Sequence, residues 1–198
     1  MRELYGGNLC LDFANTVEPR AAEPQHDHLH GYADLVRWAR HAGALDEAQA
    51  SRLLAAAASR REAAEASFAT AIDLREATYR TFAAVATGAD PAGSDLAVLQ
   101  RAYAGAMHHV RLRPAAERLT WEWEDDQLDR AWWPMARAAV ELATAGPLDR
   151  VKRCPPGCAF LFYDASKNRI RRWCSMDECG SHEKARRQTD RRRRARAS

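Results

Sequence analysis

Four cysteines close to the end of the sequence have the spacing of a tetrahedral metal site. They are Cys154, Cys158, Cys174 and Cys179. Three residues separate the first pair, four separate the second, and 15 lie between the pairs. Each pair can supply two thiolates from one turn, and a hairpin in the gap would bring the pairs together. Because Zn²⁺ prefers thiolate ligands and four of them leave no open coordination position, the pattern predicts a structural zinc ion rather than a catalytic one.

Two other residues of ligand type are not expected to bind this metal. His182 lies three residues after Cys179, a helical spacing suited to ligation, but four cysteines already fill the site. Cys10 lies in the apolar run over 9–14, where a free cysteine behaves as a small buried hydrophobe. In a reducing compartment, closely paired cysteines favour metal binding over disulfide formation.

Positive charge is concentrated around and after these cysteines. Residues 150–198 contain 15 Lys and Arg against five Asp and Glu, whereas residues 1–149 contain 15 against 22. A positive surface of this kind is attracted to a phosphate backbone. The predicted nucleic-acid contacts are Lys167, Arg169, Arg171, Arg172, His182, Lys184, Arg186, Arg187, Arg191 and Arg194.

The spacing of the last basic residues favours duplex DNA as the partner. The residues that recur every three or four positions, and so share one helix face, are Lys184, Arg187, Arg191 and Arg194. No aromatic residue is interleaved with them, so stacking on single-stranded bases is not expected. RNA binding through the same basic face stays open as an alternative, and competition between duplex DNA and structured RNA would separate the two.

The elements that must position the cysteines can be predicted from the same segment. A tight turn at the first pair is followed by a strand over 160–163, a turn over 164–168 and a returning strand over 169–173. Ser175 and Glu178 match a capping box, so a helix is expected to begin near Met176 with the last cysteine in its first turn. Together these elements make a treble-clef-like zinc finger. Its core is too small to hold it together without the metal.

The first part of the sequence is expected to form a larger, mostly helical domain. Apolar residues at helical spacing predict helices over 32–42, 46–59, 62–85, 94–109 and 128–144. Alternating residues predict strands within 6–16, 110–113 and 118–124, which are expected to pair in a small antiparallel sheet. The fold class is therefore α+β, mostly α. The predicted boundary lies at Gly146-Pro147, with domains over 1–147 and 148–198.

A ligand site in the larger domain is expected close to its first residues. The candidate ligand-binding residues are Asp12, Asn15, His28 and Trp38. Each also has a structural interpretation, because Asp and Asn often fix turns and a Trp at helical spacing often lies in a core. We expect the domain either to bind a small-molecule effector or to form a homodimer.

The sequence lacks the motifs of common enzyme classes. It has no Gly-rich phosphate-binding loop, no G-x-S-x-G elbow and no H-E-x-x-H pair. An enzyme with its site in the first 149 residues, and with a purely structural zinc, stays open as an alternative. No apolar run is long enough to cross a membrane and no signal-peptide pattern is seen, so we expect no membrane partner and a cytoplasmic protein.

The sequence resembles the CGNR zinc-finger proteins, a bacterial family with an N-terminal ABATE domain. The resemblance rests on Gly-Gly-Asn-Leu-Cys-Leu-Asp-Phe-Ala-Asn-Thr at 6–16, on the helical middle and on the four-cysteine segment over 154–187. It implies a stress-related transcription regulator that binds DNA through its finger. It also implies that the four cysteines are the zinc ligands.

The motif that gives this family its name is only half kept in the chain. Cys-Gly-Asn-Arg is here Cys179-Gly180-Ser181-His182. The change removes an arginine that the resemblance implies as a DNA contact, and His182 can supply at most a hydrogen bond to phosphate in its place.

Overall fold

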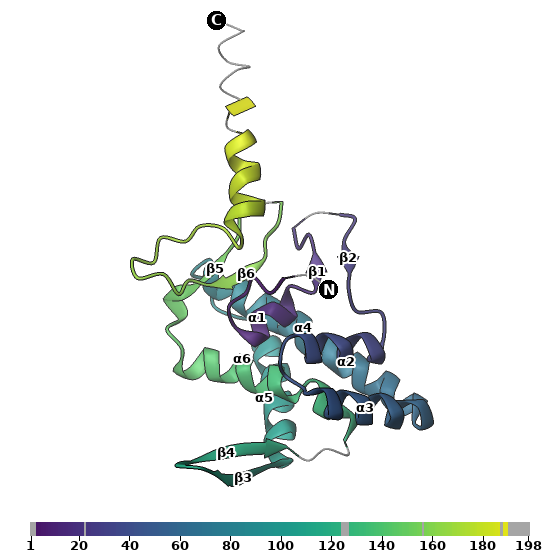
Figure 1. The fold of residues 1–198 in the computed structure, drawn as a ribbon. Coiled ribbons are helices and arrows are strands. Elements are labelled where there is room, and N and C mark those ends of the chain that lie inside the picture. Colours follow the sequence, from purple (N-terminus) through teal and green to yellow (C-terminus); the bar gives the residue numbers. More distant parts are fainter. Residues whose placement is uncertain (1–2, 22, 124–126, 156, 187, 190–198) are drawn as a thin grey trace, which may run out of the picture.

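The molecule consists of a helical body and a small C-terminal module from which one helix projects (Figure 1). The structure is a computed structural model that describes residues 3–21, 23–123, 127–155, 157–186 and 188–189. Helices dominate, and the strands form short antiparallel pairs. The α+β, mostly α class predicted from the sequence is therefore confirmed.

Each of the five helices predicted for the body is present, and they are α2 (Tyr32–His41), α3 (Glu47–Ser59), α4 (Arg61–Ala86), α5 (Gly93–His108) and α6 (Trp133–Ala145). A further helix, α1 (Leu9–Ala14), and two short 3-10 turns, η1 (Leu128–Ala131) and η2 (Leu148–Arg150), accompany them. Local chemistry sets their ends. Asp46 caps α3 by accepting a hydrogen bond from the Gln49 N–H at 2.7 Å, and the Gln49 side chain accepts from the Asp46 N–H at 3.0 Å.

The first helix, α1, lies where the sequence pattern predicts a strand. The alternation of Leu9, Leu11 and Phe13 is misleading because the residues between them are buried as well, so the segment has no polar face. A short apolar run cannot be assigned by its period alone. A helix N-cap favours the helix over a strand, since the Asn8 side chain accepts a hydrogen bond from the Cys10 N–H at 3.1 Å.

The strands form three separate antiparallel pairs within the described residues. They are β1 (Val17–Glu18) with β2 (His26–Asp27), β3 (Val110–Ala115) with β4 (Arg118–Trp123), and β5 (Val151–Arg153) with β6 (Leu161–Tyr163). The hairpin predicted from the alternating segments is confirmed as β3–β4, although Glu124 lies outside the described residues. Its predicted pairing with an N-terminal strand is wrong, because that segment forms α1.

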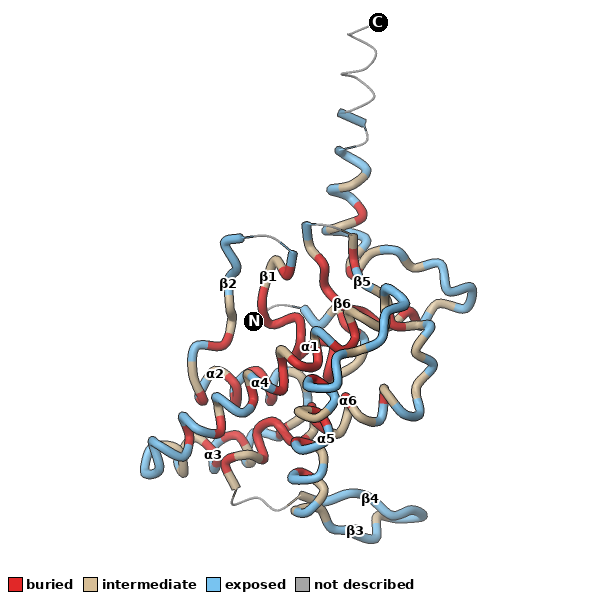
Figure 2. Tube along the Cα trace, turned by 180° about the vertical axis from the view of Figure 1, so that it is seen from behind, coloured by how far each residue is buried: buried red, intermediate tan, exposed pale blue. Residues whose placement is uncertain are grey.

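The core of the body is built around α1 (Figure 2). This helix is buried along almost its whole length and contacts α4, α6 and β6. Phe13 of α1 packs against Trp38 of α2 with ring centroids 5.3 Å apart. Apolar side chains from every helix between α1 and α6 join the same cluster. Within the part of the chain that the structure describes, no helix is both long and apolar enough to cross a membrane.

Two buried arginines attach α1 and the β1–β2 segment to α4. The Arg20 Nε donates to the carbonyl oxygen of Ala14 at 2.8 Å, and its Nη1 pairs with Glu76 at 2.6 Å. Arg75 of α4 pairs with Asp27 at 2.7 Å. A buried guanidinium is tolerated only when its donors are paired, so these contacts fix β2 relative to α4.

The β5–β6 hairpin belongs to both parts of the molecule. Val151 and Leu161 join the core of the body, whereas Phe160 and Phe162 pack against the cysteines, because successive side chains of a strand point to opposite faces. The Asn15 amide donates to the Leu161 carbonyl at 2.8 Å and accepts from the Leu161 N–H at 2.9 Å. The division of the chain at residue 147 stays a prediction, since the two parts share this hairpin.

Candidate metal centre and nucleic-acid interface

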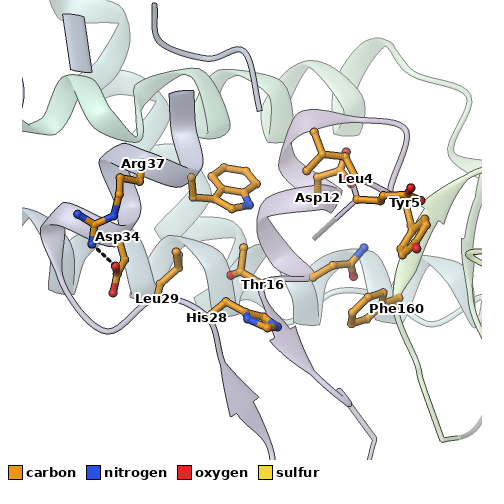
Figure 3. Close-up of a pocket in the computed structure, with 12 residues that line it drawn as sticks. Leu4, Tyr5, Asp12, Thr16, His28, Leu29, Asp34, Arg37 and Phe160 are labelled. Carbon is orange, nitrogen blue, oxygen red and sulfur yellow. Dashed lines mark hydrogen bonds and ion pairs between the residues drawn. The ribbon is translucent and has the colours of Figure 1, made fainter. Parts of the chain in front are cut away.

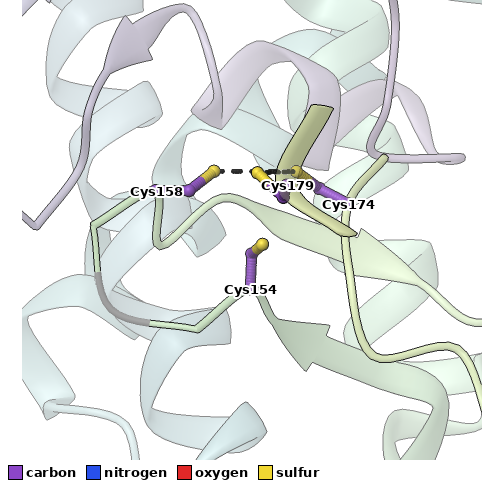
Figure 4. Close-up of side chains that lie close together, drawn as sticks. All are labelled: Cys154, Cys158, Cys174 and Cys179. Atoms are coloured by element: carbon purple, nitrogen blue, oxygen red, sulfur yellow. Dashed lines mark hydrogen bonds between the residues drawn. The ribbon is translucent and has the colours of Figure 1, made fainter. Parts of the chain in front are cut away.

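The four cysteines converge from two segments, the β5–β6 hairpin and the start of the projecting helix (Figure 4). Cys154 directly follows β5, and Cys158 lies in the turn that leads to β6, so one hairpin carries the first pair. Cys174 and Cys179 flank the start of the projecting helix. All four Sγ atoms lie within 4.8 Å of one another. The Sγ atoms of Cys158 and Cys174 are 3.6 Å apart, and those of Cys174 and Cys179 are 3.5 Å apart.

This geometry fits a four-coordinate zinc ion. Zn–S bonds of about 2.3 Å in a tetrahedron place the sulfurs about 3.8 Å apart. The same separations are far longer than the S–S bond of about 2.05 Å in a disulfide, and the cysteines are free. His182 is not among the described residues whose ligand atoms converge here, in line with a site made of cysteines alone.

The crowded thiols titrate as one group. Hydrogen bonds from the neighbouring thiols lower the pKa of Cys154 to about 3, while the Cys154 thiolate and burial raise the pKa of Cys158 to about 12. The pKa values of Cys174 and Cys179 are also raised, by the neighbouring sulfurs and by burial respectively. Four thiolates this close together repel one another, so a cation that accepts all four sulfurs would also displace their protons.

The hairpin of the finger is not the one predicted from the sequence. Residues 160–163 were expected to pair with a returning strand over 169–173, but β6 pairs with β5, which precedes the first cysteine. Residues 169–173 form no strand. The knuckle lies in the turn of the β5–β6 hairpin rather than before a hairpin, and only the position of the helix after it is as predicted. The predicted returning strand is instead part of a loop that polar contacts hold.

Asp164 at the end of β6 organises this loop. Its fully buried carboxylate accepts hydrogen bonds from Lys152 Nζ at 2.5 Å, the Ser166 N–H at 2.9 Å and the Arg171 N–H at 3.1 Å. Burial opposes ionisation, but these donors hold the pKa of Asp164 well below its usual range. The segment thus meets its backbone hydrogen-bonding needs through a side chain, which removes the need for a second strand.

Arg171 donates its hydrogen bonds to main-chain carbonyls in and beside this loop. Its Nε donates to the Trp173 carbonyl at 3.0 Å and its Nη2 to the Tyr5 carbonyl at 3.0 Å, with a further hydrogen bond to the Cys174 carbonyl. The guanidinium also lies 4.6 Å from the centre of the Phe162 ring. These contacts use most of the donors of Arg171 within the chain, and its predicted contact with nucleic acid stays a prediction.

The helix that carries Cys179 begins as predicted. Ser175 caps it by accepting a hydrogen bond from the Glu178 N–H at 3.3 Å. Its first turn, η3 (Met176–Gly180), is a π-turn, and the helix continues over 181–186. A Cβ on Gly180 would lie 2.6 Å from the Met176 sulfur, so a larger residue here would require the exposed Met176 side chain to move. The helix points away from the body (Figure 1).

The remaining basic residues of the finger differ in how free they are. Lys167, Arg172, His182, Lys184 and Arg186 are exposed. Arg169 forms an ion pair with Asp149, and Arg186 forms one with Glu183 at 2.6 Å. Arg172 borders two grooves beside the helix, one of about 480 Å³ shared with His182 and Arg186 and one of about 550 Å³ shared with Lys184. Arg187, Arg191 and Arg194 lie outside the described residues.

A second cavity, of about 240 Å³, lies where the body meets the finger (Figure 3). All four residues predicted as ligand-binding line it, namely Asp12, Asn15, His28 and Trp38. Their binding role stays a prediction, and the amide of Asn15 is already used by β6. Sequence reasoning missed two aromatic walls of the cavity, Tyr5 and Phe160. No sequence pattern joins these two residues, because they meet only through the fold.

Known protein families were compared with the chain. The ABATE family, described as "Putative stress-induced transcription regulator", matches residues 7–146. The CGNR zinc finger matches residues 150–192. No curated protein matches the chain significantly. The two matches together cover both the body and the finger.

Proposed function

The chain belongs to the ABATE family and carries a CGNR zinc finger, and from this premise we propose that it is a regulator of transcription whose zinc-stabilised finger binds duplex DNA. The family description favours a regulator over an enzyme. The single observation that carries the proposal is the convergence of four cysteine sulfurs at the base of an exposed, basic helix.

The proposed role of the metal is structural. Zn²⁺ held by Cys154, Cys158, Cys174 and Cys179 would supply four bonds that tie the knuckle to the helix. The chain's own residues do the rest. Tyr5 Oη donates to the Glu178 carboxylate at 3.0 Å, which anchors the first turn of the helix to the N-terminal segment. Held at its base in this way, the helix can present its charges in a fixed direction.

The proposed DNA contacts are the exposed basic groups near this helix. They are Lys167, Arg172, His182, Lys184 and Arg186, together with Arg187, Arg191 and Arg194, which the sequence places on the continuing segment. We omit Arg171 because its donors are used within the loop. Contacts of this type go to phosphates and do not by themselves select a sequence.

The body supplies the regulatory half of the proposal. A small-molecule effector in the cavity lined by Asp12 and Trp38 would touch residues of the body and of the finger at once. Binding there could change DNA affinity only if the effector makes different contacts in two arrangements of the finger. Phe160 and Tyr5 are the side chains through which such contacts would reach the finger.

The test is duplex-DNA binding by the zinc-loaded full chain across a salt series, followed by fluorescence anisotropy. The logarithm of the binding constant should fall steeply and linearly with the logarithm of salt concentration. Replacing Arg172, Lys184 and Arg186 by alanine should weaken binding at least tenfold and reduce the slope by about 3.

A matched control removes three charges from the body instead. Arg61, Arg101 and Arg118 are exposed there, and their replacement by alanine should leave the slope unchanged. Absence of DNA binding at low salt, or an equal loss in the control, would sink the DNA-binding proposal. If a structured RNA displaces the labelled duplex at a lower concentration than unlabelled duplex does, RNA would replace DNA as the proposed partner.

A further inference from the structure

The cavity between body and finger contains an unsatisfied acid. Asp12 of α1 is only 8% exposed. Its Oδ1 accepts a hydrogen bond from the Gly6 N–H at 2.6 Å. Among the described residues no hydrogen bond reaches Oδ2, although this carboxylate lines the cavity. Among the described residues Oδ2 is not one of the buried side-chain atoms that lack a partner, so it faces the open space of the cavity, where a donor from outside the chain can reach it.

The basic groups at the same cavity are already paired with other acids. Arg37 forms an ion pair with Asp34 at 2.5 Å, and His28 Nε2 lies 2.7 Å from a Glu18 oxygen. Neither therefore neutralises Asp12. A further cation, Arg171, acts on Asp12 only through its charge, because it directs its donors at main-chain carbonyls. The charge left in the cavity is negative.

Aromatic rings line much of the rest of the cavity. Tyr5, Trp38 and Phe160 come from the N-terminal segment, from α2 and from the finger. Their ring faces carry partial negative charge and attract an organic cation, most strongly when water is excluded. Asp34, Arg37 and His28 lie around the cavity as well (Figure 3). A carboxylate beside aromatic walls is the chemistry that recognises a protonated amine.

We propose that this cavity binds a small organic amine in its ammonium form. The N–H groups would donate to Asp12 Oδ2, and the apolar part would lie against the aromatic side chains. A volume of about 240 Å³ suits a small molecule rather than a peptide or nucleotide. No bond is made or broken, so the site is a binding site and not a catalytic one.

The electrostatics of Asp12 agree with this ligand class. Burial raises the pKa of Asp12 to about 6, although the Gly6 N–H and Arg171 oppose the shift. The carboxylate is thus mostly ionised at pH 7 and poorly compensated. A cation that enters the cavity stabilises the charged form and gains an interaction that a neutral or anionic molecule of the same shape lacks.

The ligand would also contact the finger. Phe160 packs with the cysteines, and Tyr5 reaches the helix through its hydrogen bond to Glu178. An effect of the amine on DNA affinity rests on the proposed function, whereas binding of the amine does not. The two parts can therefore be tested separately.

The binding test uses three probes of nearly equal shape on the zinc-loaded full chain, measured by isothermal titration calorimetry at pH 7. Benzylamine is cationic, benzyl alcohol is neutral and benzoate is anionic. Benzylamine should bind in the millimolar range or more tightly, and at least tenfold more tightly than the other two. Equal binding of the three probes, or no binding of benzylamine in that range, overturns the proposal.

Two variants locate the site. Asp12→Asn keeps an oxygen acceptor for the Gly6 N–H but removes the charge, and it should weaken benzylamine binding at least tenfold. Asp90→Asn makes the same change at an exposed residue between α4 and α5 and should leave binding within about twofold. Retained affinity in Asp12→Asn overturns the assignment to this cavity. The comparison of the three probes needs no variant and stands if Asp12→Asn does not fold.

The coupling test repeats the DNA titration with the cavity saturated by benzylamine. Linkage requires that any change in DNA affinity be matched by an equal change in benzylamine affinity when DNA is bound. A matched change of at least threefold supports the effector role. Unchanged DNA affinity overturns the coupling. Failure of the chain to bind DNA at all counts against the proposed function, and the calorimetry, which contains no DNA, is not affected by it.

Discussion

The helical body buries apolar side chains from all of its helices in one cluster, whereas the separate apolar cluster of the finger has four buried members among the described residues, Cys154, Phe160, Phe162 and Cys174. The body can obtain its stability from the hydrophobic effect. The finger cannot, because two of the four side chains in this cluster are thiols that ordinarily serve as metal ligands. The comparison teaches that one chain is stabilised in two ways, by apolar burial in the body and by metal binding in the finger. The β5–β6 hairpin contributes side chains to both regions.

Loss of the metal should produce the largest difference between the two regions. Chelation, or the variant Cys174→Ser, should remove hydrogen-exchange protection from residues 157–186 and leave α2 to α6 protected, because structural zinc contributes on the order of 10 kcal/mol. Elemental analysis and exchange mass spectrometry measure the two effects. Cys10→Ala, which alters a buried thiol of the body, should keep the metal. Equal loss of protection in both regions would show that they form a single cooperative unit.

The contact between Asn15 and the hairpin should give the next largest effect. Asn15→Ala leaves the N–H and the carbonyl of Leu161 buried without partners, which should cost about 2–4 kcal/mol of unfolding free energy. Urea denaturation of the zinc-loaded chain measures it. Asn8→Ala removes only a helix cap and should cost about 1 kcal/mol. Equal costs for the two variants would mean that Asn15 does not join the regions.

Asp12 should set a pH dependence in the body that the finger does not share. The pKa of Asp12 is raised in the folded state to about 6, so the folded chain binds a proton more readily than the unfolded chain does. Stability from this group is full below the unfolded pKa of 3.8 and is lost as the pH rises through 6. Asp12→Asn should therefore gain on the order of 2 kcal/mol over the wild type between pH 4 and pH 7.

The measurement for Asp12 is the difference in unfolding free energy between variant and wild type at several pH values. Taking the difference cancels the titration of the other groups. Asp90→Asn, at an exposed position, should show a flat difference. A flat difference for Asp12→Asn as well would show that burial does not shift its pKa.

The smallest effect is expected from Arg172, next to Arg171 in the sequence but different in role. Arg172 is exposed, so Arg172→Ala should change unfolding free energy by less than about 0.5 kcal/mol and weaken DNA binding by severalfold. Arg171→Ala should lower stability by more, because it removes the donor to several carbonyls. Urea denaturation and fluorescence anisotropy on the two variants measure stability and DNA affinity. A larger loss of stability in Arg172→Ala than in Arg171→Ala would contradict the roles given to these two residues.

Helices and strands with one polar and one apolar face could be predicted well from the sequence. Segments that are buried on every side could not. Helices α2 to α6 have polar faces, and their periods are clear. The segment of α1 is buried on all sides, so its alternation carries no information. The strand expected over 169–173 fails for another reason, because the carboxylate of Asp164 replaces the partner strand as a hydrogen-bond acceptor.

The two candidate sites also differ in how far the sequence predicts them. The cysteine cluster could be predicted because the ligand types and their spacing are written in one short stretch of sequence. The cavity could be predicted only in part. Asp12 and Trp38 lie in the first forty residues, whereas Phe160 is more than a hundred residues away, and only the packing of β6 against α1 brings them together.

The hydrogen bonds between Asn15 and Leu161 also bear on how the chain is made. The two residues are 146 positions apart, and α1 lies at the centre of the core. During synthesis α1 leaves the ribosome well before its partner strand, because Leu161 follows Asn15 by 146 positions. The body therefore cannot be completed until the first two cysteines of the finger have been made, so a chain that stops before them would expose the partly formed core to proteases and chaperones.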